Sequence, residues 1–330
     1  MALLGEADLR DELRDRRRRL ETAMTGAGGT ASLTRLLDEV DAALARMDTG
    51  TYGVCESCRD PIEIERLLGD PLTRTCTDHL TPEEHRALEE DLALASRVQS
   101  ELLPKREPAL PGWESFYHYE PARSVGGDYC DLVTAGPDGD ALYFLLGDVA
   151  GKGMAASILM AALRAIVRTL VDAGPSPVAL VARANRLFCE TALPQHFATL
   201  VCGKAAPSGE IEICNAGHCQ PLLLRNGGAE RIESTGLPIG LFTSVEYGAR
   251  KLAMAPGETL VLYSDGVIES QNQAGKEYGV DRLAAALARR PALRPKELVM
   301  AGLEDLVRFR AGAPAGDDLT LLALRRAPRT

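Results

Sequence analysis

The stretch from Gly147 to Gly153, GDVAGKG, constrains the fold more than any other part of the chain. The short apolar segment 141–146 before it has the composition of a buried strand. The apolar segment 154–173 after it has helical spacing. An acid, Asp148, therefore stands where a buried strand ends and a Gly-rich turn opens a helix.

Three further acids occupy comparable positions. Asp265 follows an apolar strand, Asp317 precedes another, and Asp128 lies in a Gly-Gly-Asp turn before a third. For any single Asp beside Gly, a turn is the simpler interpretation. Four acids at the ends of apolar strands, however, would lie near the rim of one sheet assembly. Crowded carboxylates stay ionised only when a cation compensates their charge.

This set of acids favours a particular metal chemistry. Oxygen ligands without nearby His or Cys select Mg²⁺ or Mn²⁺. Two such ions about 3.5–4 Å apart would activate a water for in-line attack on a phosphoester. We therefore expect a two-metal site that needs no Ser, Cys or His nucleophile.

A second constellation consists of Cys55 and Cys58, followed after seventeen intervening residues by Cys76 and His79. This spacing predicts a tetrahedral zinc site, with chance cysteines as the alternative. The intervening segment is too short to build its own core, so a metal would stabilise it. Because all four ligands are protein groups, the zinc would be structural and not catalytic.

Length and composition set wider limits. A chain of 330 residues with 45% hydrophobic residues suggests roughly two domains. The net charge of −10 argues against direct nucleic-acid binding. We see no apolar run of the roughly 18 residues that span a membrane, and the N-terminus becomes charged too early for a signal peptide. These features predict a cytoplasmic protein without membrane contact, whose cysteines are metal ligands or buried thiols.

The order of the expected elements suggests three regions, 1–81, 82–110 and 111–330. Helices over 6–24 and 31–48 would form a hairpin, and a connector helix would span 82–103. In the last region paired strands precede helices, which suggests antiparallel sheets with helices outside. Its expected strands are 113–120, 128–134, 141–147, 196–204, 210–215, 220–225, 257–264 and 319–325, and its expected helices are 154–173, 177–191, 280–290 and 295–310.

The connector has two interpretations. Its apolar positions and Gln99 follow the alternating spacing of a coiled coil, which predicts a homodimer through this helix. The pattern lasts only about two heptads, so a helix packed on its own domain is the alternative.

Residues 43–58, together with Ile62, 65–67 and Cys76, resemble the zinc finger of the DksA/TraR family over about 40–80. Members of that family bind RNA polymerase through a coiled-coil hairpin. The resemblance motivates an alternative function, a transcription-associated RNA-polymerase-binding regulator in which the third region, 111–330, is inert. A structural zinc-finger dimeriser is a third possibility.

A second resemblance covers about 95–326 and rests on six motifs in order. They are VGGDYCD from Val125, GDVAGKG from Gly147, NAGH from Asn215, GLPIG from Gly236, SDGVIE from Ser264 and GDDLT from Gly316. The set resembles the SpoIIE/RsbU branch of the metal-dependent (PPM) serine/threonine phosphatases. The connector at 95–104 resembles the helix that precedes such domains and transmits signals from an N-terminal sensor.

The resemblance implies an α+β fold. A four-layer α-β-β-α sandwich would hold two Mn²⁺ or Mg²⁺ ions between its sheet edges, preceded by the helical hairpin with its small zinc finger. Asp148 would bridge both ions, and the backbone carbonyl of Val149 would add a ligand. Asp265 and Asp317 would hold one metal. Asp128 would bind a metal directly or through water.

The same resemblance implies a function. The protein would be a metal-dependent protein serine/threonine phosphatase acting on a STAS-type anti-sigma-factor antagonist in a sigma-factor regulatory pathway, with Asp148 and Asp265 as catalytic residues. Arg123 lies where eukaryotic relatives carry a phosphate-binding arginine, although a surface salt bridge is an equal alternative. Ala150 stands where some relatives have a histidine proposed as general acid.

Four other polar residues near the motifs have two interpretations each. His218 is a candidate general acid or metal ligand, but a structural role at the sheet edge is preferred. Glu269 and Asp131 are candidates to orient metal-bound water, or are surface acids. Lys152 would attract phosphate or face solvent.

Overall fold

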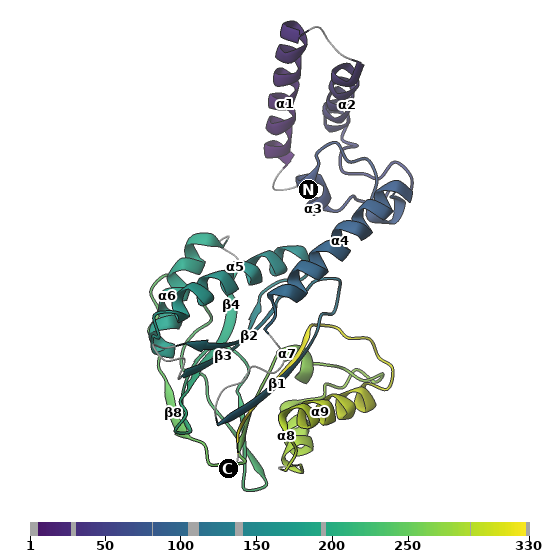
Figure 1. Cartoon of the computed structure of the whole chain (residues 1–330). Helices are drawn as coiled ribbons and strands as arrows, with labels where there is room; N and C mark the ends of the chain where they lie inside the picture. Colours follow the sequence, from purple (N-terminus) through teal and green to yellow (C-terminus); the bar gives the residue numbers. More distant parts are fainter. Residues whose placement is uncertain are drawn as a thin grey trace. The chain divides into compact units, whose positions relative to one another are not determined.

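The computed structural model describes residues 6–27, 31–80, 82–104, 112–135, 141–192, 196–290 and 292–327. The chain divides into two compact units, Met1–Asp91 and Leu92–Thr330. The division falls inside helix α4 (Pro82–Leu102), so one helix contributes to both units (Figure 1).

The first unit is helical, with a metal-ligand-rich loop region. It contains α1 (Glu6–Ala27), α2 (Ala31–Asp48), α3 (Ile64–Gly69) and the single 3-10 turn η1 (Thr77–His79). Helices α1 and α2 pack side by side through an apolar stripe that includes Leu13 and Val40 (Figure 1). Cys55 and Cys76 belong to the same buried cluster, so the loops close the end of this small core.

The second unit contains two five-stranded sheets, in the orders β1-β10-β9-β6-β7 and β2-β3-β4-β5-β8. Every strand pair among the described residues is antiparallel, as the sequence predicts. The strands are β1 (Trp113–Glu120), β2 (Asp128–Ala135), β3 (Ala141–Val149), β4 (Ala198–Ala205), β5 (Glu210–Ala216), β6 (Leu222–Arg225), β7 (Gly228–Arg231), β8 (Arg250–Ala253), β9 (Thr259–Tyr263) and β10 (Leu319–Arg326).

Three buried clusters hold this unit together. Helices α5 (Met154–Val171) and α6 (Pro177–Thr191) pack on β2, β3 and β4. A second cluster joins residues of the two sheets, such as Phe144 of β3 and Leu322 of β10. In the third, α8 (Val280–Ala288) and α9 (Pro295–Arg310) pack on β9 and β10 (Figure 1). The remaining helix is the single turn α7 (Asp265–Ile268).

Helix α5 corrects one expectation from the sequence. It has 18 residues and is long and apolar enough to span a membrane by length and composition. Its buried positions, including Met160 and Val167, belong to the core that covers β2 and β3. The apolar length of α5 therefore reflects packing against a sheet.

Candidate active site

Asp128 and Asp148 are brought together by the pairing of β2 with β3, which places them directly opposite each other. Opposed residues in an antiparallel pair project from the same face. Asp128 is 1% exposed, and the Thr320 hydroxyl donates a hydrogen bond to its Oδ2. Its Oδ1 is buried without a partner among the described residues. Burial, with Asp148 next, raises the pKa of Asp128 well above its usual range.

Asp265 and Asp317 come from the other sheet. Asp265 opens α7 directly after β9, and Asp317 lies just before β10. Because β9 and β10 pair antiparallel, the end of one and the start of the other lie at the same edge. Burial, followed by the charges of Asp265 and Asp317, raises the pKa of Asp148 to about 7. Acids from both sheets therefore form one electrostatic cluster.

Lys152 lies in the Gly-rich turn after β3 and points toward this cluster. Its Nζ is 2.7 Å from Oδ2 of Asp317 and donates to the Gly316 carbonyl at 2.9 Å. The hydrogen bond to Asp317 raises the pKa of Lys152. Lys152 and Asp317 also line a cleft of about 450 Å³ that continues past Glu269 and Ser270.

Arg123 is exposed and forms no ion pair with any residue that the structure describes. Its positive charge opposes that of Lys152, whose pKa is nevertheless raised by the hydrogen bond to Asp317. The alternative interpretation, a surface salt bridge, is therefore not observed within the described ranges. The charges of Arg123 and Lys152 therefore interact, and Lys152 also contacts the acidic cluster through Asp317.

Asp318 is a site residue to which the sequence analysis assigned no role. Its Oδ1 accepts a hydrogen bond from the Ala122 N–H at 2.8 Å. Its Oδ2 accepts from the N–H groups of Gly127 and Asp128, at 2.7 and 3.3 Å. Asp318 thus holds the loop that presents Asp128. The doubled acid of the Asp317–Asp318 motif was the only signal for it in the sequence.

Val149 ends β3 and is fully buried. Its N–H donates to the Gly127 carbonyl at 3.3 Å. A Cβ atom at Gly127 would lie 3.0 Å from the Val149 carbonyl oxygen. The backbone of Val149 therefore lies against the loop that carries Asp128, while its side chain belongs to the core.

His218 and Asp131 have structural partners. The His218 Nδ1 is 2.7 Å from the Thr199 hydroxyl, and burial lowers the pKa of His218 to about 4, which supports the preferred structural role. Asp131 is fully buried and accepts two hydrogen bonds from the Arg168 guanidinium of α5, at 2.5 and 2.6 Å. Glu269 lies at the surface. The part of its carboxylate that is shielded from water, followed by the charge of Asp265, raises its pKa.

A separate cluster in the first unit contains Cys55, Cys58, Cys76 and His79. Their ligand atoms all lie within 4.8 Å of one another, and it is the only such group of three or more His, Cys, Asp or Glu among the described residues. The Sγ atoms of Cys58 and Cys76 are 3.7 Å apart. Tetrahedral zinc with bonds of about 2.3 Å to sulfur requires a separation of about 3.8 Å. The donor set therefore fits one zinc ion.

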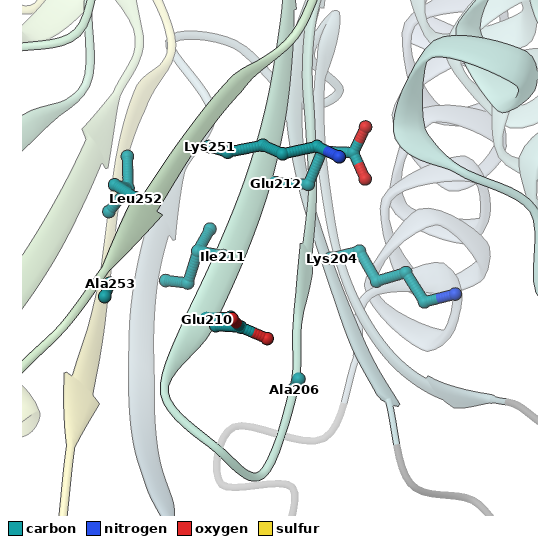
Figure 2. Close-up of a pocket in the computed structure, with 8 residues that line it drawn as sticks. All are labelled: Lys204, Ala206, Glu210, Ile211, Glu212, Lys251, Leu252 and Ala253. Carbon is teal, nitrogen blue, oxygen red and sulfur yellow. The ribbon is translucent and has the colours of Figure 1, made fainter.

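A second cleft, of about 500 Å³, lies on β4, β5 and β8 (Figure 2). Strand register places Lys204 opposite Glu212, and Glu212 opposite Lys251. Thr199, which pairs with Asp148, lies five residues earlier on β4, roughly 17 Å along the strand. This cleft is therefore remote from the acidic cluster, and we assign it no part in the chemistry.

The second unit thus consists of two antiparallel sheets, with acids from both sheets in one cluster. The family model described as "Stage II sporulation protein E (SpoIIE)" matches residues 138–327, more than half of the chain. The chain belongs to the SpoIIE family, and its second unit is thereby placed among the protein serine/threonine phosphatases.

Relatives among characterised proteins include IcfG of Synechocystis sp., 28% identical over 72% of this chain and 41% of IcfG. The phosphoserine phosphatase RsbU of Bacillus subtilis is 23% identical, over 72% of this chain and 71% of RsbU. This chain therefore spans less than half the length of IcfG and most of the length of RsbU.

Two solved structures show the same fold. The RsbU and RsbW domains of Rv1364c from Mycobacterium tuberculosis are 30% identical, with a TM-score of 0.60 over 68% of this chain and 62% of that one. The SiaA-PP2C domain of Pseudomonas aeruginosa is 19% identical, with a TM-score of 0.66 over 75% of this chain and 99% of that one.

Proposed function

We propose that this protein hydrolyses phosphoserine or phosphothreonine on a protein substrate, using two Mn²⁺ or Mg²⁺ ions. The observation that carries the proposal is the convergence of Asp128 and Asp148 with Asp265 and Asp317 from the other sheet. Burial and mutual repulsion raise the pKa values of three of these acids, and a bound cation would relieve that cost. The unpartnered buried Oδ1 of Asp128 also fits a cation, directly or through water.

The proposed ligands follow from these positions. Asp148 would bridge the two ions and the Val149 carbonyl would add a ligand, while Asp265 and Asp317 would hold one ion. When bound, the metals supply an activated water and neutralise charge on the phosphoryl group. Thr320 and Asp318 keep Asp128 in place through hydrogen bonds.

The cations of the site have a separate role. Arg123 carries no competing ion pair in the described ranges, so its guanidinium is free to bind phosphoryl oxygens. Lys152 would add a second positive charge at the mouth of the cleft. Ala150 has no titratable proton, so its side chain cannot protonate the leaving group.

For the substrate we propose a phosphorylated STAS-type anti-sigma-factor antagonist. The support is the similarity to the phosphoserine phosphatases RsbU and RsbP of Bacillus subtilis. The protein would then act in a sigma-factor regulatory pathway in the cytoplasm, without direct contact to nucleic acid or membrane.

We extend the proposal to the architecture and the first unit. A four-layer α-β-β-α sandwich is supported by the three core clusters, one between the sheets and one under each helix pair. A structural zinc finger of the DksA/TraR type is supported by the compact Cys₃His donor set. We further propose that this unit regulates the phosphatase, with a homodimer formed through α4.

Turnover of p-nitrophenyl phosphate and of a phosphorylated STAS protein with Mn²⁺ tests the proposal. Asp148→Ala and Asp265→Ala should each lower turnover by on the order of 10³-fold, because each removes a metal ligand. Asp281→Ala is the matched control, because that carboxylate is 95% exposed and lies outside the acidic cluster. Unchanged turnover in both site variants would exclude the two-metal mechanism.

The same preparation tests the alternative function. Stoichiometric binding of RNA polymerase, together with no metal-dependent turnover by the wild-type chain, would support the regulator with an inert phosphatase-like domain.

A further inference from the structure

Gln99 is an unusual residue of α4. The structure describes every residue of this helix, and only Gln99 is buried. It is 6% exposed, while its neighbours Leu94 and Val98 are 52% and 56% exposed. A buried amide on a helix that leaves Leu94 and Val98 exposed must be held by specific polar partners.

Those partners are both backbone groups of one residue. The Nε2 of Gln99 donates to the Gly126 carbonyl at 2.7 Å, and the Gly126 N–H donates to Oε1 of Gln99 at 3.0 Å. The Tyr119 hydroxyl also donates to Oε1, at 3.4 Å. The side-chain amide therefore pairs with Gly126 in the way that a neighbouring strand would.

Gly126 begins the Gly-Gly-Asp sequence that ends at Asp128. The next two N–H groups, of Gly127 and Asp128, donate to Asp318. A Cβ atom at Gly126 would overlap the Asp318 carboxylate and the Tyr119 hydroxyl. This loop is thus held on one side by α4 and on the other by the residue that precedes β10.

We propose that Gln99 is a positioning residue for the metal site, which fixes the loop that presents Asp128 and so makes metal affinity depend on where α4 lies. The inference rests on the proposed function, because it assigns Asp128 to the metals. Without the amide, both polar groups of Gly126 lose their buried partner, which favours other loop conformations. Residues that orient a ligand in this way commonly change metal affinity by about tenfold or more.

The test uses the full chain and the nearly isosteric variant Gln99→Met. Mn²⁺ binding is measured by titration calorimetry, and turnover of p-nitrophenyl phosphate is measured against Mn²⁺ concentration. We expect an Mn²⁺ dissociation constant about tenfold higher, with kcat restored at saturating Mn²⁺. Val98→Ala, at the exposed adjacent position, should leave both values unchanged.

A purely structural role would give a different result. If Gln99→Met lowers the melting temperature but binds Mn²⁺ as the wild type does, the proposal is wrong. Should Gln99→Met fail to fold, Gln99→Asn keeps the amide and withdraws it by one methylene. Weaker Mn²⁺ binding by Gln99→Asn then supports the proposal, and wild-type binding overturns it.

This experiment distinguishes a failure of the proposed function from a failure of the role assigned to Gln99. A wild-type chain without Mn²⁺-dependent turnover contradicts the proposed function. A wild-type chain that binds Mn²⁺ and turns over, with Gln99→Met indistinguishable from it, contradicts only the role of Gln99.

Discussion

At the scale of single residues, the acidic cluster costs the folded protein stability when no cation is bound. An aspartate in an unfolded chain has a pKa of about 4. In the folded protein, burial and the charges of Asp265 and Asp317 raise the pKa of Asp148 to about 7. Between these pH values the folded state binds the extra proton. The free energy of unfolding therefore falls as pH rises from about 4 to about 7.

Asp148→Asn should remove this cost, because an amide does not ionise. In EDTA at pH 7 we expect the variant to be more stable than the wild type by on the order of 2 kcal/mol, allowing for solvent screening at a partly exposed site. Its stability should also depend less on pH between 4 and 7. Urea unfolding across this range measures both effects, with the exposed Asp281→Asn as control. A variant no more stable than the wild type would show that burial and the neighbouring carboxylates do not raise the pKa of Asp148.

At the scale of elements, the loop region of the first unit contains little regular structure. Among the described residues between α2 and α4, the helical elements are α3 and the single turn η1. Cys55 and Cys76 lie in its buried core, so a metal at this point would tie the loops to the helical hairpin.

Cys58→Ser should therefore lose zinc. We expect about one zinc per wild-type chain after dialysis, and zinc affinity lower by on the order of 100-fold or more in the variant. Metal analysis by mass spectrometry measures the zinc content. Cys189→Ser, at a half-buried cysteine of α6, is the matched control. Equal zinc content in both variants would exclude the Cys₃His site.

The elements also show how far the sequence was informative. Long apolar segments predicted β1 to β6, β9, β10 and the main helices, because their periodicity extends over several residues. The strands β7 and β8, the short helix α3 and the single turn α7 were missed, because none of them has a long apolar pattern. Strand β6 is as short as β7, but its run of leucines predicted it.

The sequence motifs predicted which acids would lie near one another. They did not predict residues whose partners are distant in the sequence. The strand-end acids could be grouped from their contexts alone. Asp318 acts through Ala122 and Gly127, nearly 200 positions away. Gln99 matched a coiled-coil position in the sequence, whereas the structure pairs it with Gly126. Neither contact leaves a local trace in the sequence.

At the scale of the whole molecule, each compact unit has its own core. The buried apolar cluster of the first unit ends at Cys76, and those of the second begin at Trp113. Two cores without shared buried side chains predict two unfolding transitions, since cooperativity follows shared packing.

Calorimetry of the full chain should show both transitions. A zinc chelator should lower only the midpoint of the transition of the first unit, because its proposed ligands all lie there. Mn²⁺ should raise only the other midpoint, because ligand binding stabilises the unit that binds it. A single transition that responds to both treatments would show that the units unfold as one.

The position of β10 determines when the acidic cluster can form during synthesis of the chain. This last strand lies between β1 and β9, and the segment before it supplies Asp317 and Asp318. Thr320 reaches back 192 residues to Asp128. At the usual rate of synthesis, roughly 10–40 s pass between the addition of Asp128 and the addition of Thr320. A nascent chain therefore cannot complete the acidic cluster until β10 has been made and has paired with β1 and β9.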